Sequence, residues 1–180
     1  MSNKATAISQ FEEFLKSDDK GILITGTHQY EKHKLAMKVI NKHYSGAKIL
    51  FRINALKNID GDDFLGWAGV KKQPKAGEQV RIGKNYYQFD SFNNSGTWYK
   101  TDHNFDLAIV YPIDSLCREK DIKPIRDLYE HKHIKKIILC SWTDKAEYDY
   151  SLFRDYYINN IVYDALEEDP EYHKRVLEYL

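Results

Sequence analysis

A glycine and a lysine lie six positions apart, at Gly26 and Lys32, and Thr27 and His33 each follow one of them. The interval is that of a phosphate-binding loop, G-x-x-x-x-G-K-[ST], in which backbone N–H groups and the lysine hold phosphate oxygens. A helix that begins directly after such a loop also aims its first N–H groups at an anion. The stretch therefore predicts nucleotide or phosphate binding by Gly26, Thr27, Lys32 and His33.

A strand and a helix are expected on either side of this loop. Residues 22–25 form a short apolar run between two glycines, which indicates a buried strand. After the loop, Leu35, Ala36, Val39 and Ile40 recur at helical spacing and predict a helix that ends near residue 42. The order of strand, glycine turn and helix supports the interpretation of the loop as an anion site.

The rest of the chain alternates strands with helices and predicts an α/β fold with three layers. A mostly parallel sheet of about five strands is expected, because strands separated by helices pair in parallel with right-handed crossovers. The whole chain, 1–180, is expected to form a single domain. Strands are predicted at residues 22–25, 48–53, 105–111, 134–141 and 160–163, and helices at 9–18, 35–42, 121–130, 146–157 and after Pro170.

Residues 71–101 break this alternation and predict an antiparallel β-hairpin insertion. Apolar and aromatic residues indicate strands at 79–82 and 86–89, joined by a turn at 83–85, and a third strand at 97–100. Because aromatic rings stack on bases and cations pair with phosphates, the insertion predicts a nucleic-acid-binding surface. A hairpin that binds protein, or whose aromatic face packs on the core, is the alternative. The residues predicted to contact nucleic acid are Arg81, Lys84, Tyr86, Trp98 and Lys100.

The stretch around Gly26 resembles the phosphate loop of P-loop NTPases. Gly26 matches the first glycine of that motif, and Lys32 matches its phosphate-binding lysine. Glu31 stands where the motif has its second glycine, and His33 stands where a Ser or Thr would bind magnesium. The resemblance implies a P-loop NTPase-like fold, with ATP or GTP as the cofactor.

Two later strands extend this resemblance, and the first of them lacks the acid of the family. In P-loop NTPases an apolar strand ends in an acid that positions magnesium and water. Here residues 107–110 are followed by Tyr111, and Asp114 comes three positions later. The second strand, ending at Ser141, matches one that senses the terminal phosphate. A carboxylate at Glu31 would also repel phosphate, by about 4 kcal/mol for a contact at ~4 Å. A degenerate site is therefore expected, with weak or no NTPase activity.

Composition and charge set few limits on the partner. Lys and Arg balance Asp and Glu at 27 each, so net charge favours no class of ligand. The charges are unevenly placed, because residues 144–172 carry nine acids against two bases, whereas residues 71–100 carry six bases against two acids. Two cysteines and the lack of a long apolar run predict a cytoplasmic protein with no membrane partner.

Metal sites and other catalytic arrangements receive little support. The seven histidines and two cysteines show no zinc-binding spacing. Residues 60–63, Asp-Gly-Asp-Asp, lack the distal Glu of a calcium loop and predict a turn before a short helix. A metal-dependent nuclease built on Asp90 and Asp106 stays open, although no acid-x-lysine pattern follows on a neighbouring strand. No structural metal is therefore expected.

Overall fold

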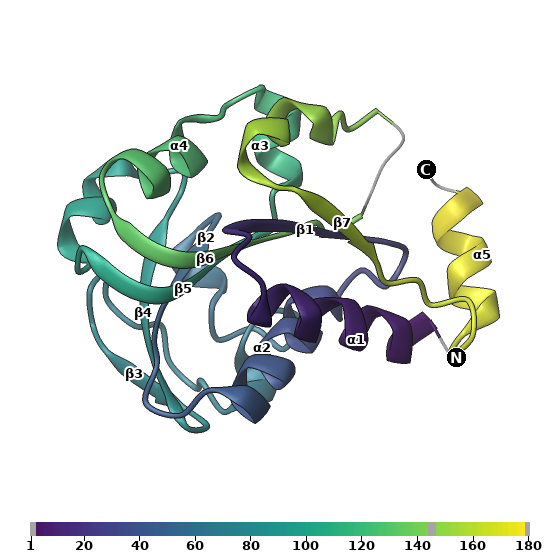
Figure 1. The fold of residues 1–180 in the computed structure, drawn as a ribbon, viewed down its shortest axis with the longest axis horizontal. Coiled ribbons are helices and arrows are strands. Elements are labelled where there is room, and N and C mark those ends of the chain that lie inside the picture. Colours follow the sequence, from purple (N-terminus) through teal and green to yellow (C-terminus); the bar gives the residue numbers. More distant parts are fainter. Residues whose placement is uncertain (1–2, 144–146, 179–180) are drawn as a thin grey trace.

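The computed structural model describes residues 3–143 and 147–178, and its centre is a β-sheet with helices on both faces (Figure 1). In that part of the chain the sheet has seven strands in the order β3-β4-β2-β5-β6-β1-β7. Neighbouring strands are parallel except for β3 and β4. The strands are β1 (Gly21–Thr25), β2 (Lys48–Ile53), β3 (Val80–Ile82), β4 (Asn85–Ser91), β5 (Asn104–Tyr111), β6 (His133–Cys140) and β7 (Asn159–Val162).

Two pairs of helices cover the two faces of the sheet (Figure 1). Helices α1 (Asn3–Lys16) and α2 (Lys32–His43) lie on one face, and α3 (Asp114–Glu119) and α4 (Lys123–Glu130) lie on the other. Helix α5 (Pro170–Glu178) lies beyond the edge strand β7, near the start of α1. The described residues also form 3-10 helices at Leu56–Asn58, Gly66–Ala68, Ser95–Lys100 and Tyr150–Tyr156.

The sheet separates two hydrophobic cores, because successive side chains of a strand point to opposite faces. On β6, Ile138 and Cys140 belong to the core beneath α1 and α2. Their neighbours Ile137 and Leu139 belong to the core beneath α3 and α4. Continuous apolar runs in β5 and β6 are therefore explained by burial on both faces, as expected of parallel strands covered by helices.

The predicted alternation of strands and helices is confirmed, but the sheet is larger than expected. Seven strands are described where about five were predicted, because β4 pairs in parallel with β2 and carries β3 at the sheet edge. The antiparallel hairpin is present, and it extends the main sheet. The sequence does not predict helix α3. The helix predicted from residue 146 begins outside the described residues, and the part described is the 3-10 helix Tyr150–Tyr156.

The third strand predicted for the insertion, at residues 97–100, is wrong because this segment is a 3-10 helix. The side chain of Asn94 accepts a hydrogen bond from the amide of Gly96 at 3.1 Å and starts the helix. The indole nitrogen of Trp98 donates to the carbonyl oxygen of Ser91 at 2.8 Å. These contacts fold the segment back on the end of β4 and override the strand preference of its Thr, Trp and Tyr residues.

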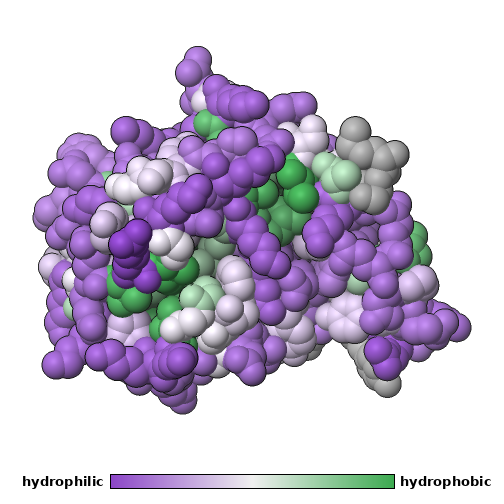
Figure 2. Space-filling model, turned by 90° about the horizontal axis from the view of Figure 1, so that it is seen from below, coloured by the Kyte–Doolittle hydropathy of each residue, from purple (hydrophilic) through white to green (hydrophobic). Residues whose placement is uncertain are grey.

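The outer surface of the described residues carries few large apolar side chains, as expected if these residues fill the two cores. No helix in residues 3–143 or 147–178 combines the length and the hydrophobicity that crossing a bilayer requires. The face formed by α1 and α2 is mostly hydrophilic, with hydrophobic atoms in small separate areas (Figure 2). The large apolar side chains are thus mainly in the two cores on either side of the sheet.

Candidate functional site

The strands β1, β6 and β5 end side by side, and the segments that follow them form the candidate site. Ile24 on β1 is opposite Cys140 on β6, and Leu139 is opposite Val110 on β5. We call this end of the sheet, where the strands reach their carboxyl ends, the carboxyl edge; the term does not refer to the outermost strands β3 and β7. In parallel α/β sheets, ligands bind outside the carboxyl ends of the strands. The three segments that resemble P-loop NTPases therefore meet at the edge where a ligand is expected.

Gly26 and Lys32 lie in contact at this edge. Lys32 is in the first turn of α2 and is fully buried, and its Nζ donates to the carbonyl oxygens of Gly26 and Trp142, the latter at 3.0 Å. Gly26 has a φ of +122°, and a Cβ there would lie 2.2 Å from the carbonyl oxygen of Tyr163. The bend after β1 therefore requires glycine, and it brings a backbone carbonyl onto the lysine ammonium group.

The amides of this loop are met by residues 163–173, which we call the C-terminal segment and which run from the end of β7 into α5. The acceptor at Thr27 is a carboxylate, so the chain itself places an anion against the loop. The remaining acceptors are uncharged. The three hydrogen bonds are Thr27 N to Asp164 Oδ1 (2.9 Å), His28 N to the carbonyl oxygen of Tyr163 (3.3 Å), and Gln29 N to the hydroxyl of Tyr172 (3.3 Å).

Side chains add to the contact between the loop and the C-terminal segment. The hydroxyl of Thr27 accepts from the amide of Ala165 at 3.0 Å and lies 2.6 Å from Nδ1 of His173. Nε2 of His28 lies 3.0 Å from a carboxylate oxygen of Glu168, and this hydrogen bond lowers the pKa of Glu168. The loop is therefore held closed by polar contacts that come from one distant stretch of the chain.

His33 follows Lys32 in the sequence but belongs to the interior. It is fully buried, its Nε2 donates to the carbonyl oxygen of Phe64 at 2.7 Å, and its ring stacks on Tyr111 with centroids 4.1 Å apart. Burial lowers the pKa of His33 to about 3, so the ring is neutral at pH 7. Its Nδ1 has no hydrogen-bond partner among the described residues. A neutral imidazole is a poor magnesium ligand, and its part in nucleotide binding stays a prediction.

The acid nearest to the end of β5 has a structural partner. Strand β5 ends at Tyr111, and burial raises the pKa of that phenol. Asp114 is buried, and its carboxylate accepts from the amides of Trp142 at 2.6 Å and Thr143 at 2.9 Å. Asp114 thereby fixes the segment after β6, whose Trp142 carbonyl accepts from Lys32. The arrangement connects the ends of β1, β5 and β6 through hydrogen bonds.

In residues 3–143 and 147–178, no three His, Cys, Asp or Glu side chains are grouped so that they could hold a metal ion. The two acids considered for a nuclease are each paired with a cation. Asp90, near the end of β4, accepts two hydrogen bonds of 2.8 Å from Arg52, and Asp106, near the start of β5, accepts from Lys135 at 3.2 Å. Because these strands run in the same direction, the two carboxylates lie toward opposite edges of the sheet.

The residues predicted to bind nucleic acid are spread over the hairpin and the following 3-10 helix. Arg81, Lys84 and Lys100 are exposed, and Tyr86 is half-buried. Trp98 is also half-buried, and the guanidinium of Arg52 lies 4.5 Å from the centroid of its ring. The Trp98 ring is thus used to cover the buried pair of Arg52 and Asp90. Nucleic-acid binding by this set stays a prediction.

Comparison with known proteins gives a structural match without a sequence match. No protein-family model and no curated protein matches the sequence. The structure resembles the large terminase of a thermophilic bacteriophage, solved in complex with ADP, with a TM-score of 0.58 and 8% sequence identity. The match covers 99% of this chain and 48% of the terminase chain, so this chain spans about half of that length.

The fold is P-loop-like. At such low identity, the similarity establishes the fold alone. Within this P-loop-like fold, the sequence predicts the glycine, the lysine and the elements that carry them. It does not predict the C-terminal segment as part of the site, because Asp164 is 137 positions from Thr27. In the sequence, the C-terminal segment is marked only by its acidic composition.

Proposed function

We propose that this chain binds a nucleotide such as ADP, ATP or GTP through its phosphates at the loop between β1 and α2, and that it hydrolyses nucleotides weakly or not at all. The observation that carries the proposal is the position of Lys32. Its ammonium group lies at the carbonyl oxygen of Gly26, in the bend of the loop, on a fold similar to that of a terminase solved with ADP. A lysine in this position is suited to hold a phosphate oxygen.

The start of α2 supports the same assignment. The first amides of a helix have no acceptor within the helix, and the helix dipole favours a negative group at this end. Glu31, at the N-cap, forms no side-chain capping hydrogen bond with them. Gly26, Thr27 and Lys32 would therefore contact the phosphates, while His33 would support the loop from the interior.

Weak or absent hydrolysis is proposed because, in the described part of the chain, the two positions where the motif supplies oxygen ligands for magnesium are held by His33 and Tyr111. His33 occupies the position of the usual Ser or Thr, and its Nε2 is already used by Phe64. Tyr111 ends the strand where an acid is expected, and Asp114 is engaged by the amides of Trp142 and Thr143. Without a bound magnesium ion, little would neutralise the charge that develops during phosphoryl transfer.

Asp164 sets the expected affinity. Its carboxylate accepts the hydrogen bond from the amide of Thr27. A phosphate oxygen would need the same amide, so a nucleotide has to displace the Asp164 carboxylate. Like charges in close contact repel, and Glu31 adds a second carboxylate near the loop. We therefore expect weaker binding than a loop without an internal anion would give.

The proposal is tested by titrating the protein with ADP, ATP and GTP, using calorimetry and thermal unfolding, in magnesium and in EDTA. We expect binding and a rise in Tm that EDTA does not abolish, because magnesium ligands are not part of the proposed site. Lys32→Met keeps a long unbranched side chain and removes the charge, and it should abolish binding. Lys42→Ala, on an exposed position of the same helix, is the control and should leave binding unchanged.

Circular dichroism establishes whether Lys32→Met is folded, and Lys32→Arg, which keeps the charge, provides a second variant. Partial binding by Lys32→Arg together with none by Lys32→Met supports a charge contact with phosphate. Failure of the unchanged protein to bind any of the three nucleotides or pyrophosphate, by either method, overturns the proposal.

A further inference from the structure

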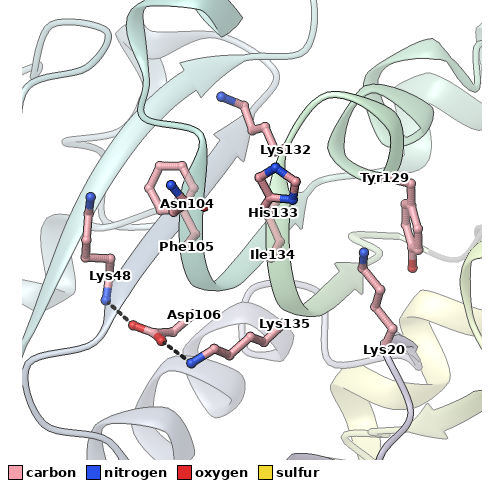
Figure 3. Close-up of a pocket in the computed structure, with 10 residues that line it drawn as sticks. All are labelled: Lys20, Lys48, Asn104, Phe105, Asp106, Tyr129, Lys132, His133, Ile134 and Lys135. Atoms are coloured by element: carbon pink, nitrogen blue, oxygen red, sulfur yellow. Dashed lines mark hydrogen bonds and ion pairs between the residues drawn. The ribbon is translucent and has the colours of Figure 1, made fainter.

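The opposite end of the sheet, which we call the amino edge, carries an open pocket of about 520 Å³ where β1, β2, β5 and β6 begin (Figure 3). Four lysines line this pocket, against a single carboxylate among its lining residues, Asp106. The lysines are Lys20, Lys48, Lys132 and Lys135. None of them belongs to the glycine loop or to the hairpin considered above. The pocket is therefore a separate basic site.

The lysines of this pocket lie at the starts of three strands, β1, β6 and β2, which together with β5 are four neighbours in the sheet. Lys20 directly precedes β1, and Lys48 is the first residue of β2, while β6 and β5 lie between these two strands. Leu107 is opposite both Ile49 and Lys136, so the strand ends are nearly level. Neighbouring strands are ~4.8 Å apart, which places Lys20 and Lys48 roughly 14 Å apart at the backbone. A single phosphate is too small to contact lysines at both ends, whereas a chain of phosphates can do so.

Three of the lysines, one exposed and two partly exposed, are available to a ligand. Lys48 pairs with Asp102 at 2.5 Å, but 41% and 50% of these two side chains are exposed. Lys135 pairs with Asp106 at 3.2 Å, and 79% of the Lys135 side chain is exposed. Exposed ion pairs of this kind contribute little, so phosphate oxygens can replace the carboxylates. Lys20 forms no ion pair with any residue in the described part of the chain.

Lys132 provides a fixed positive charge in the pocket wall. Its side chain is buried, and its Nζ donates to the Trp98 carbonyl, the Thr101 hydroxyl and the Asp102 carbonyl at 3.2, 2.9 and 2.8 Å. All three acceptors are uncharged atoms. The ammonium charge is therefore held in place without a carboxylate in direct contact, and it adds to the attraction for an anion at the pocket.

Two aromatic rings lie among these cations. Nζ of Lys20 lies 4.7 Å from the ring centroid of Tyr129, and Nζ of Lys132 lies 5.8 Å from that of Phe105. Phe105 is buried, whereas Tyr129 is half-buried and its hydroxyl donates to the carbonyl oxygen of Tyr156 at 2.7 Å. The hydrogen bond fixes the Tyr129 ring at the wall of the pocket. A base can stack on a ring held in this way when Lys20, whose Nζ lies over the ring, turns to pair with a phosphate.

We infer that the amino-edge pocket binds single-stranded nucleic acid, with successive phosphates on Lys20, Lys135 and Lys48 and a base against Tyr129. The four lysines supply the charge complementarity, and their spread across the strands calls for several linked phosphates. An unpaired strand is favoured over a duplex because its bases are open for stacking. The inference goes beyond the proposed function and uses none of its residues, so either one can fail alone.

The test measures fluorescence anisotropy of a labelled oligo(dT) with the full chain over a range of salt concentrations. Binding should weaken as salt rises, because cations that neutralise phosphates release counterions. Lys20→Ala with Lys135→Ala should lower the affinity about tenfold and reduce the slope of log K against log salt by about 1.4, for two lost phosphate contacts on a single strand. Arg81→Ala with Lys84→Ala removes the same charge from the hairpin, the other predicted nucleic-acid surface, and should change the affinity less than about twofold if the amino edge is the binding site. Lys42→Ala with Lys57→Ala, at exposed positions outside both surfaces, is the matched control.

The stacking contact is tested separately at Tyr129. Tyr129→Leu should weaken binding by about tenfold, whereas Tyr129→Phe, which keeps the ring, should bind nearly as well as the unchanged protein. Circular dichroism shows whether each variant is folded. The inference is overturned if no oligonucleotide binds, if the hairpin variant loses as much affinity as the amino-edge variant, or if a duplex or free dTMP binds as tightly as the single strand.

Discussion

The two edges of the sheet belong to the same strands, yet they differ in charge and in access. At the carboxyl edge, Lys32 is fully buried in its own loop, and Asp164 places a carboxylate on the Thr27 amide. At the amino edge, four lysines line an open pocket that contains one carboxylate. At the edge with the recognisable phosphate-binding spacing, the internal carboxylate occupies an amide of the loop itself, whereas at the edge without a motif Asp102 and Asp106 pair with partly exposed lysines. Spacing alone therefore does not locate the surface that is most accessible to a phosphate.

The difference also concerns how each edge is held. The glycine loop depends on the C-terminal segment, because residues after β7 supply the acceptors for Thr27, His28 and Gln29. The amino edge depends on the strands themselves. Lys20 directly precedes β1, which pairs with β6, and Lys48 begins β2, which pairs with β5. A ligand at the carboxyl edge must rearrange existing contacts, whereas one at the amino edge replaces weak surface ion pairs.

The largest predicted effect is on the stability of the carboxyl edge. Gly26→Ala places a Cβ 2.2 Å from the carbonyl oxygen of Tyr163 at a φ of +122°, so β7 or the loop must move. We expect the free energy of unfolding to fall by about 3 kcal/mol or more in urea denaturation. Gly69→Ala is the control, because its φ is +89° and nothing lies within 4 Å of the new Cβ, so backbone strain alone should cost about 1 kcal/mol. Equal losses in the two variants would contradict the close packing of the loop on β7.

Local patterns in the sequence predict the β1–loop–α2 unit, because an apolar run, a glycine and a helical repeat follow one another within about twenty residues and indicate a strand, a turn and a helix. They fail at residues 97–100, where strand-forming side chains are redirected by hydrogen bonds to Asn94 and Ser91. Arg52 shows the same limit. It lies within an apolar strand, and its partners Asp90 and Asp127 are 38 and 75 positions away, so no local pattern identifies them.

The amino-edge pocket was predictable in part. Lys48 begins a predicted strand, and Lys20 and Lys132 each lie two residues before one, while parallel strands bring their amino ends to one edge. Combining those two facts would have placed the lysines together. The order of the strands was still needed, because it decides which lysines are neighbours. The contacts of Asp164 were not predictable, since they depend on how β7 joins the edge of the sheet next to β1.

Acid is predicted to destabilise the protein through His33, which is buried beside the carboxyl edge. Burial lowers the pKa of His33 to about 3, against 6.5 in the unfolded chain, with smaller contributions from Lys34 and Lys32. Below pH 6.5 the unfolded state binds a proton that the native state excludes, so stability falls as pH is lowered toward 3. The slope approaches about 1.4 kcal/mol per pH unit. We expect this fall in urea denaturation between pH 6.5 and 5, above the range in which most carboxylates titrate.

His33→Gln should flatten this pH dependence, because it removes the titrating group while offering an amide donor to Phe64. His133→Gln, at an exposed position on the amino edge, is the matched control and should retain the full slope. An NMR titration in which the His33 ring takes up a proton near pH 6.5 in the folded protein would contradict the assignment of the slope to this residue.

A moderate effect is expected when the internal anion loses its charge. Asp164→Asn keeps an oxygen that can accept from Thr27 and removes the repulsion toward phosphate, so the affinity for ADP should rise about tenfold, or 1.4 kcal/mol. Glu171→Gln removes an exposed charge from the first turn of α5 and is the control. Calorimetric titration separates the two outcomes. A similar gain in both variants would indicate general electrostatics, and no gain in Asp164→Asn would show that this carboxylate does not compete with the ligand.

The smallest predicted effect is at the amino edge. Asp102 pairs with Lys48 and accepts from Gln88 at 3.0 Å, and hydrogen bonding to Lys48 lowers the pKa of Asp102. Asp102→Asn retains an acceptor for Gln88, and because the pair is half-exposed, its loss should cost less than about 1 kcal/mol of stability. The same change releases the Lys48 ammonium group and should strengthen oligo(dT) binding about twofold to threefold in the anisotropy assay. Weaker binding would mean that Asp102 holds Lys48 in the position that the ligand needs, so that the ion pair prepares the pocket and does not compete for it.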